Sequence, residues 1–242
     1  MKHAITKIEE RIARAAQAAG RRVEDVTLIG VSKTHPAELV REAYAAGVRI
    51  FGENRVQEAE SKIPECTDLP DIEWHLIGHL QRNKAKKAVQ LFRLIHSVDS
   101  LSLAQALGRY AIELGLAPVR ILLQCNVSGE DSKEGIVACN WESDAQVRSD
   151  VTALVAAIGE IDGIRIEGLM TVAPYSDDQE AVRGVFRSLR MLRDLLQSAV
   201  PNHTLTTLSM GMSGDIDVAV AEGATLVRVG RAIFGERTYP TV

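Results

Sequence analysis

Residues 26–33 read VTLIGVSK, a short apolar run that ends on Lys33. The run is too short for a typical helix and is rich in β-branched residues, which predicts a strand buried on both faces, as in parallel sheets. Lys33 would then stand at the carboxyl end of this strand. In α/β folds, that edge of the sheet is where ligands bind.

Lys33 has two interpretations at this stage. Most lysines at strand ends simply carry their charge into water. In an apolar socket, desolvation would instead favour the uncharged amine and lower the pKa of the lysine, leaving a nucleophile that forms Schiff bases with carbonyl compounds. The choice depends on whether the rest of the chain supplies a place for the carbonyl compound.

Strand-like and helix-like runs alternate along the whole chain. The expected strands are residues 26–33, 48–52, 72–78, 93–98, 120–127, 164–171, 206–210 and 226–229. The expected helices are residues 36–47, 56–63, 80–91, 101–114, 147–158, 179–199 and 215–221, after an amphipathic first helix with Ile5, Ile8, Ile12 and Ala15 on its apolar face. Such alternation implies parallel strands with right-handed crossovers. We therefore expect one α/β domain over residues 1–242, a (β/α)8 TIM barrel with an extra N-terminal helix.

A doubly wound open sheet is the alternative fold. It would often carry a dinucleotide or nucleotide site, but no GxGxxG follows a strand and no GxxxxGK[ST] occurs. The barrel is therefore the preferred prediction.

Composition excludes several classes of function. The formal net charge is −4 and only 4% of the 242 residues are aromatic, which argues against a nucleic-acid surface. Cys66, Cys125 and Cys139 are far apart and odd in number, so they predict neither a disulfide framework nor a metal knuckle, but reduced thiols in a cytoplasm. The N-terminus has no signal-peptide pattern, and no apolar run has the length of a membrane span.

Two glycine-containing loops near the end of the chain suit an anion. Residues 208–217 read LSMGMSGDID and place Ser213 between a strand and a helix, where backbone amides and a hydroxyl can bind phosphate. An ordinary turn with Ser213 as a helix N-cap is the alternative. Residues 226–235 read LVRVGRAIFG, so Gly230 and Arg231 directly follow the last strand. In barrels, the loops after the seventh and eighth strands often form a phosphate site.

Three further residues are candidates for the same site. Arg228 lies inside the last apolar strand, where it either pairs with a carboxylate inside the barrel or faces the ligand as a permanent donor. Asn54 follows the second strand and could also be a helix N-cap. His75 is a further candidate for contact with the ligand, and a packed, hydrogen-bonded side chain is the alternative. His75 and His79 are not a helical metal pair, because Gly78 intervenes.

A strand-end lysine facing a phosphate site fits a phosphorylated aldehyde. Pyridoxal phosphate satisfies this description, and so does a sugar phosphate that an aldolase would bind. Both possibilities stay open on the residues alone.

The sequence resembles the pyridoxal phosphate homeostasis protein family over nearly its whole length. The matching blocks, in the order of the family, are LIGVSKTHP, FGENRVQEA, WHLIGHLQRNK, QCNVSGEDSKEGI, GLMTVAP, LSMGMSGDID and VRVGRAIFG. The resemblance implies a single barrel related to the barrel domain of alanine racemases, with pyridoxal 5'-phosphate bound as an internal aldimine.

The resemblance also implies a role for each matching residue. Lys33 would be the Schiff-base residue and Asn54 would lie beside the cofactor ring. Ser213, Gly230 and Arg231 would hold the phosphate, and Arg228 would face the pyridine nitrogen. Arg231 is a departure, since many relatives have threonine there, which weakens the expectation of a hydroxyl contact but not that of a backbone contact.

The expected function is that of a carrier that masks and supplies the cofactor, without catalytic residues. Racemases of this type draw a second base from an added β-domain, and only eight residues follow Phe234. An arginine at the ring nitrogen also weakens the electron sink of the cofactor. A one-base racemase and a Schiff-base aldolase are the alternatives. We expect a cytoplasmic monomer whose partners are apoenzymes that depend on pyridoxal phosphate.

Overall fold

Eight parallel strands close into a ring in the computed structural model, which describes residues 1–130 and 133–235. The strands of the ring are β1 Thr27–Val31, β2 Ile50–Glu53, β3 Glu73–Leu76, β4 Leu94–Val98, β5 Val119–Asn126, β7 Ile164–Met170, β8 Thr207–Ser209 and β9 Leu226–Val229. β1 pairs with both β2 and β9, and β4 pairs with β5, so the sheet has no open edge between its first and last strands. The predicted barrel is confirmed and the open sheet is wrong.

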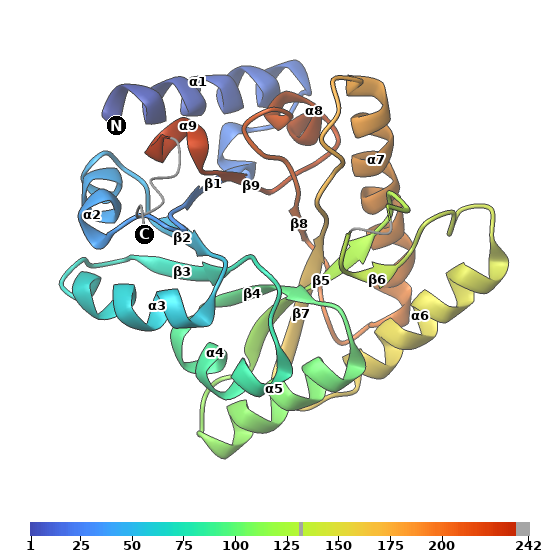
Figure 1. The fold of residues 1–242 in the computed structure, drawn as a ribbon. Helices are drawn as coiled ribbons and strands as arrows, with labels where there is room; N and C mark the ends of the chain where they lie inside the picture. The colour runs from blue at the N-terminus through green and yellow to red at the C-terminus, as the bar shows by residue number, and fades with distance from the viewer. Residues whose placement is uncertain (131–132, 236–242) are drawn as a thin grey trace.

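Helices surround the ring of strands (Figure 1). They are α1 Lys2–Ala18, α2 Ala37–Ala45, α3 Val56–Lys62, α4 Ala85–Leu91, α5 Leu101–Glu113, α6 Ala145–Gly159, α7 Gln179–Leu196, α8 Ile216–Ala221 and α9 Arg231–Phe234. The predicted N-terminal helix is α1, which lies against α8 and α9. Within the described residues, no helix combines the length and the apolar character that a membrane crossing requires.

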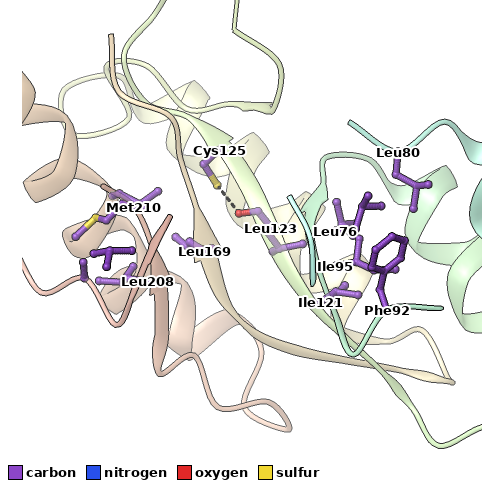
Figure 2. Close-up of a cluster of buried hydrophobic side chains, with 14 of the residues drawn as sticks. Leu76, Leu80, Phe92, Ile95, Ile121, Leu123, Cys125, Leu169, Leu208 and Met210 are labelled. Atoms are coloured by element: carbon purple, nitrogen blue, oxygen red, sulfur yellow. Dashed lines mark hydrogen bonds between the residues drawn. The ribbon is translucent and has the colours of Figure 1, made fainter. Parts of the chain in front are cut away.

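The apolar side chains form two layers, because residues along a strand point alternately to its two faces. The inner layer fills the barrel with Ile29, Leu94, Leu122, Met170 and Leu226. The outer layer packs the strands against the helices, and Figure 2 shows part of it around Leu76, Ile95, Ile121 and Leu169. This double burial explains the nearly continuous apolar strands of the sequence.

A β-bulge interrupts the pairing of β5 with β7. Ile121 pairs with Ile166 but Leu122 pairs with Gly168, so Glu167 is the extra residue. Gly168 has a φ of 154°, and a Cβ there would lie 1.8 Å from the carbonyl oxygen of Thr207. Only glycine allows β8 to approach this closely.

Several predicted boundaries are wrong. β1 ends at Val31, so Lys33 lies in the following turn and not in the strand. The helix expected over residues 80–91 is a short 3-10 turn, Arg82–Lys84, followed by α4, and the extended backbone of Gln81 keeps Leu80 outside it. The two-residue strand β6 (Ile136–Val137), which pairs with β5, and the short helix α9 were not predicted.

Candidate functional site

A cavity of about 310 Å³ opens at the end of the barrel where the carboxyl ends of the strands meet. Five of the seven predicted site residues line it, namely Lys33, Ser213, Arg228, Gly230 and Arg231. The volume is in the range of small-molecule sites in proteins. The turn after β1 and the loops after β8 and β9 therefore meet at one cavity, although nearly 200 residues separate them in the sequence.

A buried ion cluster holds the turn that carries Lys33. The ammonium of Lys62, on α3, donates to the carbonyl oxygen of Ser32 at 2.8 Å and to the carboxylates of Glu53 at 2.6 Å and Glu58 at 3.0 Å. The backbone N–H of Thr34 donates to Glu58, and Ser32 Oγ donates to Glu53 at 2.7 Å. Both neighbours of Lys33 in the chain are thus tied to one cluster.

The turn adopts a conformation that non-glycine residues rarely take. Thr34 has a φ of 65°, in the left-handed region that is costly for a β-branched residue. The hydrogen bond from its backbone N–H to Glu58 stabilises this conformation. The turn could not be predicted from its own residues, because it depends on Glu58 and Lys62 of α3, which lie more than 20 positions further along the chain.

The loop after β8 has the geometry of an anion site. Gly211 has a φ of 97°, and a Cβ there would lie 2.5 Å from the Cβ of Ala219. Asp215 accepts the N–H of Met212, which leaves the amides of Ser213 and Gly214 without an acceptor among the described residues. The N-cap of α8 is Asp215 and not Ser213, so the alternative role of Ser213 as a helix cap is wrong.

Helix α1 fixes the same loop from outside. Arg11 donates from Nη1 to the carbonyl oxygen of Ser213 at 2.6 Å, and from Nε and Nη2 to Asp217 at 2.8 and 2.6 Å. The extra N-terminal helix therefore braces the loop that holds Ser213. Sequence reasoning missed this role, since the contact joins residues about 200 positions apart.

Arg228 is buried between the cavity and the barrel interior, with 5% of its surface exposed. Nη1 donates to Ser209 Oγ at 2.6 Å and Nη2 to the carbonyl oxygen of Thr171 at 2.8 Å. Burial lowers the pKa of Arg228 to about 10, and nearby Asp215 opposes this shift. The guanidinium is therefore still charged at neutral pH. Within the described residues it forms no salt bridge with a carboxylate, so that alternative is wrong.

Two predicted contacts do not lie on the cavity. Asn54 is in the bend after β2, where its carbonyl oxygen would be 2.4 Å from a Cβ on Gly78. It is not a helix cap either, because Arg55 occupies the N-cap position of α3. His75 lies inside the barrel on β3, 2% exposed, and its Nδ1 is 3.1 Å from Nε2 of His96. The alternative of a packed, hydrogen-bonded His75 describes this arrangement.

His35, Asp215 and Ser209 are further residues at or behind the cavity that sequence reasoning did not single out. The ring of His35 stacks on Phe234 with 5.3 Å between centroids, and both His35 and Asp215 line the cavity. His35 follows Lys33 by two residues and Asp215 follows Ser213 by two, so proximity to the quoted motifs was the available signal.

The cap of α7 shapes the rim of the cavity, since Gln179 and Val182 of this helix line it. Asp178 Oδ1 accepts the N–H groups of Glu180 and Ala181 at 3.0 and 3.1 Å. Asp178→Ala should therefore destabilise the protein by about 1 kcal/mol, lowering Tm by about 2–4 °C in a thermal unfolding scan. Asp177→Ala is the control and should leave Tm within about 1 °C. Equal shifts for the two variants would contradict the role of the cap.

The fold and the cavity define a class of protein, a barrel with a lysine and two glycine-containing loops at one mouth. A family model described as "Alanine racemase, N-terminal domain" matches residues 5–238. An alanine racemase of Clostridium difficile has the same fold, with a TM-score of 0.72, at 16% identity. The alignment covers 96% of this chain but 56% of that racemase.

Closer relatives narrow the class to one family. Proteins named "Pyridoxal phosphate homeostasis protein" are 46% identical in Pseudomonas aeruginosa, over 97% of this chain and 95% of that protein, and 42% identical in Aquifex aeolicus, over 97% of each. The structure of PipY from Synechococcus elongatus, with pyridoxal phosphate bound, is 44% identical over 94% of this chain and all of PipY, with a TM-score of 0.79. The chain belongs to the pyridoxal phosphate homeostasis protein family.

Proposed function

We propose that this protein binds pyridoxal 5'-phosphate through Lys33, keeps its reactive aldehyde masked, and releases it for use by other enzymes. One observation carries the proposal: Lys33 and the loops holding Ser213 and Gly230 line a single cavity, with Arg228 in its wall. The relatives named for homeostasis of this cofactor, and the PipY structure that contains it, support the same function.

The chemical groups of the cavity fit the cofactor. The amides of Ser213 and Gly214, which have no acceptor in the part of the chain that the structure describes, are suited to a phosphate together with Gly230 and Arg231. Arg228 is a charged donor suited to an unprotonated ring nitrogen. When bound, the cofactor would supply an aldehyde, and the amine of Lys33 would be the group that condenses with it, with loss of water.

A carrier is favoured over an enzyme. The relatives at 42–46% identity have names that refer to homeostasis, whereas the alanine racemase of Clostridium difficile is only 16% identical. We infer that apoenzymes receive the released cofactor. We also infer that the protein acts as a monomer, since this chain itself supplies the lysine and both loops at the cavity. We also infer a cytoplasmic location from its three free cysteines.

The experiment that tests the proposal is chemical trapping. Purified protein is incubated with pyridoxal phosphate, reduced with borohydride, digested with trypsin and analysed by mass spectrometry. The adduct should be found on Lys33. Pyridoxal, which lacks the phosphate, should load far less at the same concentration, because it cannot use the two loops.

The outcomes separate the alternatives. Modification of another lysine, or no modification, would refute the proposed site. Preferential trapping of a keto or aldose phosphate on Lys33 would favour the aldolase. Racemisation of alanine or serine faster than with the free cofactor would favour the racemase.

A further inference from the structure

A chain of hydrogen bonds runs from Arg228 into the barrel, away from the cavity. Arg228 Nη1 donates to Ser209 Oγ at 2.6 Å, and Ser209 Oγ is 2.9 Å from His96 Nδ1. His96 Nε2 is in turn 3.1 Å from His75 Nδ1. These four side chains come from β9, β8, β4 and β3, and each belongs to a residue that is at most 5% exposed. The chain therefore crosses the interior of the barrel.

The direction of this chain follows from its first member. A guanidinium only donates, so Ser209 Oγ accepts from Arg228, and the single hydroxyl proton of Ser209 must go elsewhere. Among the residues that the structure describes, its acceptor is His96 Nδ1. His96 then carries its proton on Nε2 and donates to His75 Nδ1, which leaves the proton of His75 on Nε2.

The far end of the chain meets a carboxylate. His75 Nε2 is 3.6 Å from Glu73 Oε2, longer than a hydrogen bond but close enough for an electrostatic attraction. Arg120 lies 4.0 Å from the same carboxylate oxygen and donates to Glu167 at 2.8 Å. The donors thus point in one direction, from the cation at the cavity to an anion near the opposite end of the barrel.

Burial keeps both imidazoles neutral. It lowers the pKa of His96 well below its usual value, and the proximity of His75 and Arg228 adds to this shift. Burial also lowers the pKa of His75, although Glu73 opposes the shift. A protonated His96 would place a second positive charge behind Arg228, which a low-dielectric interior disfavours.

We propose that Ser209, His96 and His75 are positioning residues that hold the Arg228 guanidinium as a fixed donor at the cavity wall. This inference rests on the proposed function, since Arg228 would face the ring nitrogen of the bound cofactor. With Nη1 tied to Ser209 and Nη2 to Thr171, the planar guanidinium cannot rotate. The site therefore selects a ring whose nitrogen is an unprotonated acceptor and disfavours the pyridinium form.

The first test needs no cofactor. Long-range ¹H–¹⁵N correlation spectra of the labelled wild-type protein at pH 7 report the tautomer of each imidazole, with His75→Gln and His96→Gln used for assignment. Both rings should be neutral with the proton on Nε2. A proton on Nδ1 of either ring, or a doubly protonated ring, would overturn the directed chain.

The second test uses the loaded protein and a matched pair of serine variants. Ser209→Ala removes the hydroxyl between Arg228 and His96, whereas Ser97→Ala removes an equally buried hydroxyl that has no hydrogen-bond partner among the described residues. Ser209→Ala should raise the Kd for pyridoxal phosphate on the order of tenfold, since a hydrogen bond to a charged group is lost. It should also shift the pH midpoint at which the absorbance of the bound cofactor changes.

Ser97→Ala should change neither quantity. If Ser209→Ala matches Ser97→Ala in both, the positioning role is refuted while the proposed function stands. If the wild type takes up no pyridoxal phosphate at all, the proposed function fails. The tautomers of His75 and His96 then still test whether the directed chain of hydrogen bonds exists.

Discussion

Replacing Lys33 with alanine should abolish the absorbance band of the lysine-bound cofactor, so that the protein stays colourless after incubation with pyridoxal phosphate and gel filtration. Only an amine can condense with the aldehyde, and Lys33 is the lysine that lines the described cavity. Lys33→Arg keeps the positive charge but cannot form the same bond, so it should be equally colourless. This variant separates loss of the covalent link from loss of charge.

The matched control is Lys7→Ala, which removes an exposed lysine from the outer helix α1. It should load the cofactor as the wild type does. Ultraviolet–visible spectra before and after borohydride reduction measure the result. A yellow Lys33→Ala protein with an adduct on a second lysine would show that the cavity does not hold the reactive amine.

Lys62→Met should destabilise the protein by about 3–5 kcal/mol, the cost of removing one partner from a buried ion pair. The side chain of Lys62 is 6% exposed and that of Glu53 is fully buried. Lys62 donates to Glu53 Oε1, and Glu53 Oε2 has no hydrogen-bond partner among the described residues. Methionine would leave the carboxylate of Glu53 in an apolar environment without its counter-charge. Urea unfolding at several pH values measures the loss.

The loss should depend on pH in a defined direction. Burial already raises the pKa of Glu53 and Lys62 opposes the shift, so removing Lys62 should raise this pKa further. Between the unfolded value, about 4.3, and the raised folded value, the folded state binds more protons, so stability falls as pH increases. The difference between Lys62→Met and wild type should therefore grow from pH 5 to pH 7.

A double variant supplies the control. Adding Glu53→Gln to Lys62→Met removes the stranded charge, so it should recover part of the lost stability and remove the growth of the effect with pH. If the free energy of unfolding of Lys62→Met lies within about 0.5 kcal/mol of the wild-type value, the buried ion cluster does not contribute the stability expected of it. Since Lys62 and Glu58 hold the turn around Lys33, the single variant should also load the cofactor more slowly.

The strands and the meeting of the predicted residues at one cavity follow from patterns that are local in the sequence. Apolar runs of strand length alternate with amphipathic helices, and this alternation is enough to predict parallel strands in a barrel. Gly230 directly follows β9, and Lys33 and Ser213 lie two and four residues after the last residues of β1 and β8. Parallel strands of a barrel end at the same mouth, so the topology alone brings these residues together.

The directions of individual side chains could not be predicted in the same way. His75 was expected at the cofactor, but it sits one layer deeper, because the register Gly52↔His75 places it inside the barrel below the cavity. Asn54 was expected beside the ring; it is not among the residues that line the cavity, and its backbone lies in a bend against Gly78. Both outcomes depend on how neighbouring strands are staggered, and no pattern within one strand encodes that stagger.

The sequence by itself determined the fold class, the order of the strands and the loops that form the mouth of the cavity, since each is encoded by the periodicity and the strand-end residues of a short segment. Only the tertiary structure decided what stands behind the cavity: Arg11 on the loop of Ser213, Lys62 on the turn of Lys33, and Ser209 and His96 behind Arg228. These contacts join residues from 19 to 202 positions apart, so they arise only when the strands and helices have packed into the barrel.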